Sequence, residues 1–445
     1  MASLVSAMNY TALSLEQAPP LSVPLRFFLT APLFGLAAAL VLFWFGPAAL
    51  TNRWSPVTLA LTHLMTLGFL TMTMFGAMLQ LLPVLAGSTV SRPLAVSRLL
   101  HVSLSAGVVL LCGGFLSGRT LLLALAVPVL ALACAGFVVV AAMSLARAHG
   151  PGATVTAMRL AAAALAVAAA LGLYLAAHYG RSGFNVMLAD VHPAWALLGW
   201  VGLLVIGVAY QVVPMFQMTP EYSAPVIRRL AWALFVLLAL WSLAVLVPGR
   251  PDTVPAVVIG LSCASGYALF AVLTLRLQAQ RRRRLPDVTL GYWRAGMLSL
   301  LFGAALWVAG LGVPALRHLP QYGLMLGVAM IMGFAVSVIS GMLYKIVPFL
   351  VWLHLHQRLH FSRQRLGAVP NIKEIIPERR ARAQFRVQIL ALLLLAGAVL
   401  EPRFFTYPAA AAFAVSCVML WLNLHGAART YRRVISNAGA KELIN

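Results

Sequence analysis

Charged side chains are scarce in this sequence of 445 residues. Asp, Glu, Lys and Arg make up 9% of the chain, whereas hydrophobic residues make up 62%. Soluble domains carry about 25% charged residues, so this composition excludes an ordinary soluble domain and a disordered chain. A membrane β-barrel is excluded as well, because its strands alternate polar and apolar residues and these apolar runs are continuous. The mean hydropathy of +0.94 predicts a polytopic helical membrane protein.

Cysteine and acidic residues are also few. The four cysteines stand singly in apolar runs without a CxxC pair, which excludes a disulfide scaffold and favours small buried hydrophobic residues. The net charge is +23, but the basic residues stand in short loops between apolar runs. This distribution favours orientation in a membrane, so we expect the lipid bilayer and not nucleic acid as a partner. No basic segment precedes the first apolar stretch, so no cleaved signal peptide is expected.

Twelve apolar stretches are long enough to cross a bilayer, which takes about 20 residues each. We expect a cytoplasmic lead-in over 1–25, a single membrane domain over 26–430 and a cytoplasmic tail over 431–445. An even number of spans puts both termini on one side, and 25 Lys and Arg residues then fall on that side against six on the other. The positive-inside rule therefore predicts a multi-pass protein of a bacterial-type inner membrane with both termini in the cytoplasm.

Three of the apolar stretches share one residue spacing, G-x7-G-x3-[Q/K]-x2-P. The residues are Gly68, Gly76, Gln80 and Pro83; Gly199, Gly207, Gln211 and Pro214; and Gly333, Gly341, Lys345 and Pro348. Their offsets of 131 and 134 residues correspond to one four-helix unit, so we predict repeats over about 26–145, 155–279 and 290–428. The predicted fold class is all-α, with about 12 transmembrane helices in three four-helix arcs around a pseudo-threefold axis.

The repeated residues predict one functional stripe on each helix. Positions i, i+4 and i+7 of a helix share a face, so Gly76, Gln80 and Pro83 lie in one row. Glycine lets a neighbouring helix or a flat ligand approach the backbone closely, and the polar side chain has to face protein or water. Generic packing glycines account for glycine alone, but not for a spacing that occurs three times.

A histidine inside a membrane is costly without a partner, so it marks a candidate site. His63 is the strongest candidate, because it lies in a repeated span five residues before Gly68. His192 opens the next repeated span, where a ligand and an interfacial cap are equally favoured, and His178 closes the preceding span, where an interfacial position is favoured. Imidazole ligates heme iron and copper. We therefore predict heme or copper near the outer face at His63, with His192 and His178 as further ligands. Asp190 is an acid that could orient an imidazole, although a plain loop charge is the favoured interpretation of this residue.

The segment LTHLMTLGFLTMTMFG around His63 resembles the HxHEMxxG motif of NnrS-type membrane proteins, and PLRFFLTAPLF is similar to the start of that family's first span. Twelve spans in three arcs, with His63 and His192 in the second and sixth, also resemble the heme-copper oxidase subunit I superfamily. The resemblance implies heme or copper, a redox partner or small gas ligand, and a role in nitric oxide or respiratory metabolism. Leu61, Leu64 and Val328 stand where these families carry His or Glu, so the complete oxidase ligand set is missing.

Two other functions remain open from the sequence. One is a membrane permease or carrier, although three arcs differ from the two inverted halves usual in transporters. The other is a non-catalytic scaffold that kept the oxidase-like fold without cofactors. An optical spectrum of the purified protein separates both from a heme protein, and whether the chain is an enzyme depends on that result.

Overall fold

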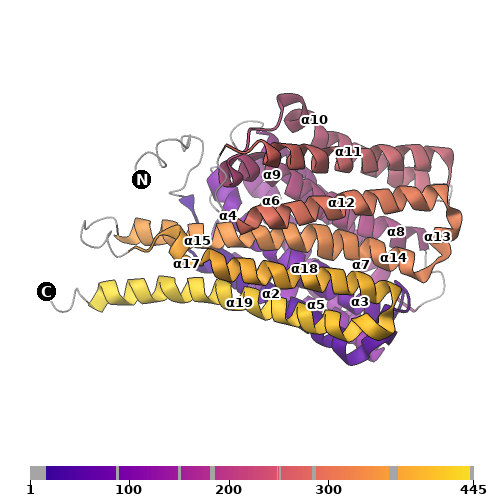
Figure 1. The fold of residues 1–445 in the computed structure, drawn as a ribbon, viewed down its shortest axis with the longest axis horizontal. Coiled ribbons are helices and arrows are strands. Elements are labelled where there is room, and N and C mark those ends of the chain that lie inside the picture. The colour runs from indigo at the N-terminus through magenta and orange to yellow at the C-terminus, as the bar shows by residue number, and fades with distance from the viewer. Residues whose placement is uncertain are drawn as a thin grey trace.

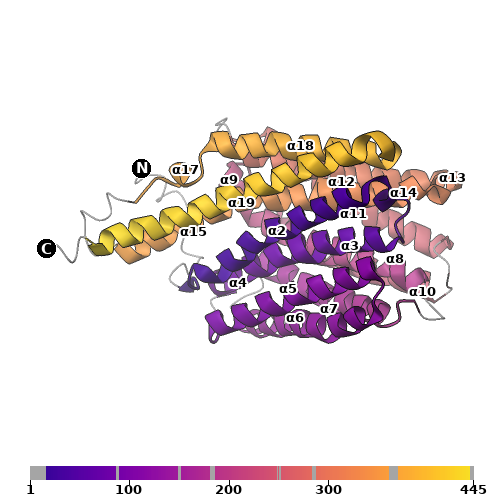
Figure 2. The same cartoon turned by 90° about the horizontal axis from the view of Figure 1, so that it is seen from below.

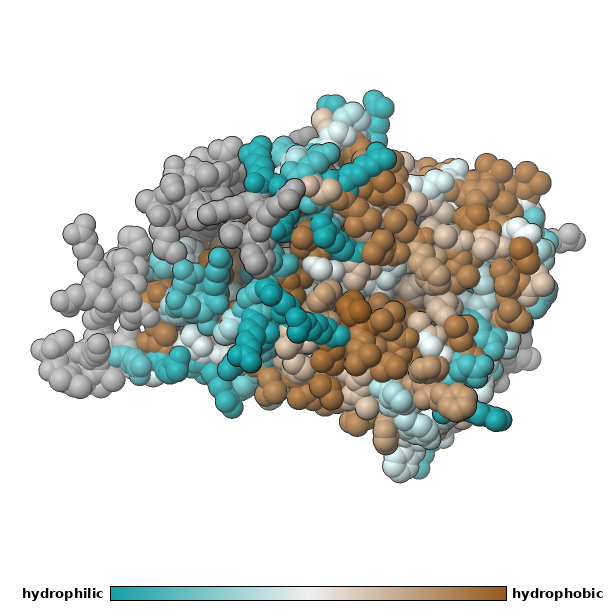
Figure 3. Space-filling view, in the orientation of Figure 1, coloured by the Kyte–Doolittle hydropathy of each residue, from teal (hydrophilic) through white to brown (hydrophobic). Residues whose placement is uncertain are grey.

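The computed structural model describes residues 17–86, 90–148, 152–180, 186–247, 249, 252–282, 287–359 and 369–440. Over these ranges the chain is helical and forms no β-strand, and twelve helices are long and apolar enough to cross a membrane. The predicted all-α polytopic architecture is confirmed. Figure 1 shows the helices running side by side along one bundle, and hydrophobic side chains gather over the right-hand part of the face in Figure 3.

Nine spans are formed mainly by one helix each. In chain order these helices are α2 (Ser22–Phe45), α5 (Pro93–Ser117), α6 (Thr120–Ala146), α7 (Ala153–Ala177), α10 (Ala224–Leu246), α11 (Val254–Ala279), α12 (Val288–Gly312), α18 (Glu378–Leu400) and α19 (Pro402–Ala440). They are spans one, three, four, five, seven, eight, nine, eleven and twelve. The helix α2 begins inside the predicted lead-in, and α19 extends into the predicted tail.

Spans two, six and ten are composite, because each has a π-helix between two α-helices. Their parts are α3 (Pro56–His63), η4 (Leu64–Thr71) and α4 (Met72–Ala86); α8 (Val186–Ala194), η5 (Trp195–Gly202) and α9 (Leu203–Gln217); and α14 (Pro320–Gly327), η6 (Val328–Val336) and α15 (Ser337–Leu359). Short helices η3 (Gly46–Leu50), α13 (Pro314–His318) and α17 (Ile372–Ile375) lie between spans.

Caps at the helix starts explain where some spans begin. The Ser55 hydroxyl accepts the Thr58 N–H at 3.1 Å, and Pro56 occupies the first position of α3, where a missing N–H has no consequence. The Asp287 carboxylate accepts the Thr289 N–H at 2.9 Å and begins α12 in the same way. These polar groups satisfy backbone N–H groups that would otherwise lack partners near the membrane.

The packing pattern repeats every four helices. The second span packs on the first, the sixth on the fifth and the tenth on the ninth. The third span also packs on the first, the seventh on the fifth and the eleventh on the ninth. The ring is closed by contacts of the twelfth span with the first, the fourth with the fifth and the eighth with the ninth. The second, sixth and tenth spans are innermost, with 83%, 72% and 67% of their most apolar windows buried against 28–50% in the others. The bundle therefore consists of three four-helix arcs around a pseudo-threefold axis.

The three π-helices occur at one position of the repeated motif. The helices η4, η5 and η6 contain Gly68, Gly199 and Gly333, the first glycine of each copy. π-helices are rare and often occur at functional sites. The residue spacing does not predict these π-helices, and their common register is a second, structural sign of the repeat.

The bundle has two distinct ends. The helix α2 begins and α19 ends at one end, which we call the termini end (Figure 2). The helices α3, α8 and α14 lie toward the opposite end, which we call the far end (Figure 1). Hydrophilic side chains gather toward the termini end on the face shown in Figure 3.

Candidate functional site

His63 is the last residue of α3, directly before the chain changes to the π-helix η4. Its Nδ1 donates a hydrogen bond to the carbonyl oxygen of Leu59 at 2.7 Å. A carbonyl oxygen can only accept, so this contact fixes the proton of a neutral ring on Nδ1 and leaves the lone pair on Nε2. The half-buried imidazole is therefore arranged as a metal ligand commonly is, with its second nitrogen held by a carbonyl.

His192 has the same arrangement on the sixth span. Its Nδ1 donates to the carbonyl oxygen of Ala168 on α7 at 3.0 Å, so Nε2 again keeps its lone pair. The ring lies against Gly172, where a Cβ atom would stand only 2.8 Å from the His192 Cε1. Glycine at this place on α7 gives the imidazole its room, and the sequence motifs did not point to it.

The two histidines face one another across the second and sixth spans. Their ring centroids are 6.3 Å apart and the ring planes differ by 15°. An ion bound in line between two imidazole nitrogens, at about 2.0–2.1 Å from each, separates the ring centroids by about 6 Å, once half of each ring is added. The spacing therefore fits two ligands of one metal ion. In the described ranges no group of three or more His, Cys, Asp or Glu side chains is close enough to hold an ion.

Aromatic side chains enclose the His63 side of the pair. The Phe115 ring on α5 lies 5.6 Å from the His63 ring, and Tyr179 packs edge-on against Phe115 at 5.1 Å. These rings come from the third span and from the end of the fifth. They limit access of water to His63 and lower the polarity around a bound ion, which strengthens its interactions with the ligands.

An ion pair lies at the far end, two residues from His192. Arg53 and Asp190 are 2.7 Å apart, with 43% and 28% of their side chains exposed. Arg53 also covers the ring of Trp54 at 4.2 Å, and its side chain packs against Gly323 of the tenth span. Arg53 thus links all three repeats. Asp190, for which a plain loop charge was favoured over the orientation of an imidazole, pairs with Arg53, and a backbone carbonyl orients His192.

His178 has contacts of its own at the end of α7. Its Nδ1 donates to the carbonyl oxygen of Tyr174 at 2.8 Å, and its ring stacks on Tyr174 at 4.2 Å. The Tyr174 side chain is 48% exposed. His178 thus bonds within its own helix, and the structure pairs His63 with His192 rather than with His178.

The repeated glycines provide close helix packing. At every one of the six positions, an added Cβ would collide with a side chain of the preceding span. The pairs are Gly68 with Phe34, Gly76 with Phe27, Gly199 with Ala164, Gly207 with Ala157, Gly333 with Ser299 and Gly341 with Tyr292. The two partners within each repeat are seven residues apart, so the same helix contact is built three times. Of the two predicted roles for glycine, close approach of a helix is the one these contacts show.

The polar residue of the motif differs between the copies. Lys345 forms an ion pair with Asp287 at 2.9 Å, where Asp287 also caps α12. Gln80 is buried and its Oε1 has no hydrogen-bond partner within the described ranges, whereas Gln211 is partly exposed. The pairing of Lys345 satisfies the requirement that an intramembrane charge faces protein rather than lipid.

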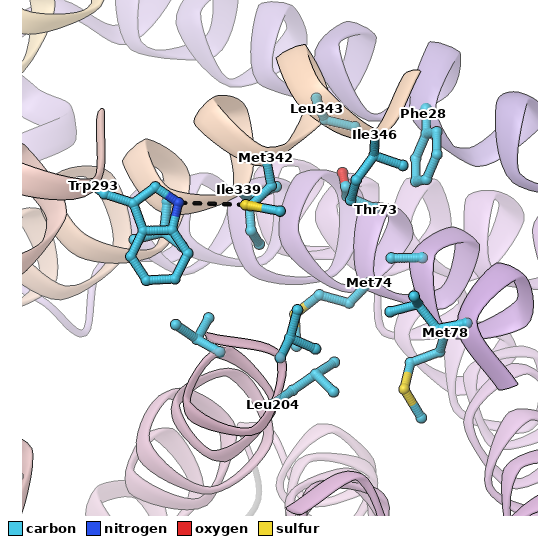
Figure 4. Close-up of a pocket in the computed structure, with 15 residues that line it drawn as sticks. Phe28, Thr73, Met74, Met78, Leu204, Trp293, Ile339, Met342, Leu343 and Ile346 are labelled. Atoms are coloured by element: carbon cyan, nitrogen blue, oxygen red, sulfur yellow. Dashed lines mark hydrogen bonds between the residues drawn. The ribbon is translucent and has the colours of Figure 1, made fainter. Parts of the chain in front are cut away.

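A cavity of about 70 Å³ lies where the second, sixth and tenth spans meet. Figure 4 shows side chains of these three spans and Trp293 of α12 around it. The Trp293 indole N–H donates to the Met342 sulfur at 3.3 Å, and the Thr73 hydroxyl donates to the Phe69 carbonyl oxygen at 2.8 Å. The walls are otherwise apolar, so the cavity offers water too few hydrogen-bond partners to be occupied by it.

A buried polar cluster joins the last four spans. The Gln384 Oε1 accepts hydrogen bonds from the hydroxyls of Tyr292 and Tyr344, the latter at 3.2 Å. The Gln384 amide donates to the Ser416 hydroxyl at 2.8 Å, and Asn423 donates to the Tyr344 hydroxyl at 2.9 Å. These side chains are at most 8% exposed. No sequence motif indicated this cluster, because its members lie on four different helices.

Comparisons with known proteins leave the family of this chain unassigned. No protein-family model matches the sequence, and no curated protein matches it. The functional conclusion therefore depends on the geometry of the His63–His192 pair.

Proposed function

We propose that this chain is an oxidase-like, NnrS-like integral membrane protein that binds a copper ion between His63 and His192. The observation that supports the proposal is the pair of half-buried imidazoles, 6.3 Å apart, whose Nδ1 atoms both donate to backbone carbonyls. Neutral imidazole is a preferred ligand of copper. Copper bound there supplies one-electron chemistry and a position for a small gas ligand, in nitric oxide or respiratory metabolism.

The proposed orientation puts this site on the outer side of a bacterial-type inner membrane. Arginine and lysine are concentrated in the loops and tail on the side of the chain termini, which is the cytoplasmic side by the positive-inside rule. His63 and His192 lie near the far end of their spans, where α3 and α8 begin. A redox partner or a dissolved gas would then approach from outside, past the Arg53–Asp190 ion pair.

The test is metal analysis together with an optical spectrum of the purified protein. We expect a stoichiometric copper ion that is lost in His63→Ala and in His192→Ala and retained in His178→Ala. His178 is the matched control, because this histidine bonds to and stacks on Tyr174 of its own helix. A Soret band that disappears in His63→Ala identifies heme instead of copper as the cofactor. Protein without metal and without chromophore contradicts the proposal.

A carrier is the second candidate function, and the central cavity is the observation that favours it. Met74, Met78 and Met342 line this cavity between the innermost spans (Figure 4), and thioethers are soft ligands that suit Cu(I). A carrier of copper would take up the ion into proteoliposomes, and Met74→Leu would reduce that uptake while copper bound at His63 remains. Uptake equal to that of empty vesicles excludes this function.

A further inference from the structure

A groove runs between α2 and α19 on the surface of the bundle. Its walls are Pro32, Leu33 and Leu36 of α2 and Val418, Trp421 and Leu422 of α19, and its volume is about 250 Å³. Leu33 and Leu422 are 46% and 54% exposed. Figure 2 shows the two helices side by side at the surface. Because the groove lies within two membrane-spanning helices, its apolar walls face the hydrocarbon of the bilayer.

The groove leads to arginines at the termini end. On α19, Trp421, His425, Arg429 and Arg432 follow one another at helical spacing on a single face, and the Trp421 and His425 rings stack at 4.8 Å. This face is the one that carries the groove residues Val418 and Trp421. Arg429 and Arg432 are exposed, and they lie about 12–16 Å along the helix from Trp421 at 1.5 Å per residue.

An arginine of α2 lies at the same level. The helices α2 and α19 are antiparallel, and a Cβ at Gly35 would stand 2.8 Å from the Cys417 sulfur, which sets their register. Arg26 lies nine residues before Gly35 on α2, toward the termini end. The same distance along α19 from Cys417 reaches the helix turn just before Arg429, so the two arginines lie at a similar level. Arg26 shares a helix face with Leu33 of the groove. The Arg26 Nε donates to the Ser22 carbonyl at 3.1 Å, so the side chain extends toward the termini end.

These positive charges lack acidic partners in the described part of the chain. The ion pairs found there are Arg53–Asp190, Lys345–Asp287 and Arg382–Glu378, and none involves Arg26 or Arg429. Arg98 on α5 is close enough to Arg26 to act on its charge, which increases the local positive potential. A negatively charged group would be attracted to this cluster. The cluster lies about 12–16 Å along α19 from Trp421, which is close to half of a bilayer core, about 15 Å.

We propose that the groove between α2 and α19 is a binding site for an anionic glycerophospholipid. Its acyl chain occupies the groove, and its phosphate lies between Arg26 and Arg429, with His425 beside it. Charge complementarity supports an anionic lipid, because a zwitterionic one carries its own cation. The apolar walls support a lipid over a free phosphate ion, because free phosphate gains nothing from Leu33 or Val418.

The experiment measures retention of dioleoyl phosphatidylglycerol and dioleoyl phosphatidylcholine by the full chain in native mass spectrometry. We expect preferential retention of phosphatidylglycerol. The double variant Arg26→Gln/Arg429→Gln should weaken this binding about 25-fold, or about fivefold for each arginine. Val418→Trp fills the groove and should weaken dioleoyl but not dihexanoyl phosphatidylglycerol. The matched control is Arg276→Gln, an exposed arginine in the last turn of α11, which should bind as the wild type does.

Several results would overturn the site. Equal retention of the two lipids removes the role of charge, and equal losses in Arg276→Gln and the double variant show attraction by general surface charge. Competition by inorganic phosphate as strong as that by phosphatidylglycerol removes the role of the groove. Unfolding midpoints in detergent without added lipid distinguish a lost site from a misfolded variant. The double variant changes only exposed or half-buried side chains, so its midpoint should equal that of the wild type.

Discussion

Replacing Gly207 by alanine tests whether the repeated glycines hold the arcs together. A Cβ at Gly207 would collide with the Cβ of Ala157 on α7. This methyl group is attached directly to the backbone and cannot rotate away, so the two helices have to separate. Overpacking of this kind costs about 1–3 kcal/mol. Alanine is also more favourable than glycine in a helix by about 0.5–1 kcal/mol. This gain opposes the cost of the clash, so a control variant has to account for it.

Gly113→Ala on α5 is the control that removes the propensity effect. Its Cβ would have one neighbour within 4 Å, the Leu122 Cδ1 at 3.6 Å, which is ordinary contact. We therefore expect Gly207→Ala to be less stable than Gly113→Ala by about 1–3 kcal/mol. The assay is reversible unfolding in mixed micelles with increasing sodium dodecyl sulfate, followed by far-UV circular dichroism. Equal stabilities of the two variants would refute the packing argument.

A second substitution makes the test specific for the helix contact. Ala157→Gly removes the opposing methyl group, so the double variant Gly207→Ala/Ala157→Gly exchanges the two residues across the interface. The gain and loss of helix propensity then cancel, and we expect stability close to that of the wild type. The coupling between the sites should equal the clash, about 1–3 kcal/mol. Additive effects of the two substitutions would show that Gly207 acts through something other than Ala157.

Two further predictions concern buried polar groups and use the same unfolding assay. Lys345→Met leaves the carboxylate of Asp287, which is 13% exposed, without its cation, and should lower the free energy of unfolding by about 1–3 kcal/mol. Adding Asp287→Asn to this variant should recover most of the loss, since the amide oxygen can still cap α12. Failure to recover it argues against the ion pair. Gln384→Leu leaves the hydroxyls of Tyr292 and Tyr344 without their acceptor and should cost about 1–3 kcal/mol. A neutral effect of Gln384→Leu would mean that the cluster adds nothing to the stability of the last four spans.

Much of the fold follows from the order of residues along the chain. Long apolar runs can satisfy their backbone groups in a membrane only as helices, so the number of spans is set by composition and length. The triple spacing of Gly68, Gly199 and Gly333 predicts that spans two, six and ten are equivalent, and all three are the most buried spans of the structure. Glycine spacing predicts helix contacts because close packing of two helices restricts a position to the smallest residue.

The candidate site is less visible in the sequence. His63 and His192 each stand out as intramembrane histidines, but their separation of 6.3 Å depends on how the first two arcs meet. The Ala168 carbonyl that orients His192 has no sequence signal at all, because every residue carries a carbonyl. Asp190 is the acid nearest to His192 along the chain, yet it pairs with Arg53, which the fold brings to 2.7 Å from it.

The amino-acid sequence alone determined that the chain is a helical membrane protein of twelve spans with three related units, because hydrophobicity and residue spacing are properties of single helices. The tertiary structure decided which polar groups meet. The His63–His192 pair, the Gln384 cluster and the Arg26–Arg429 end of the groove each combine residues from different helices. Such contacts depend on the rotation and register of one helix against another, and these follow from the packing of the whole bundle rather than from any one segment.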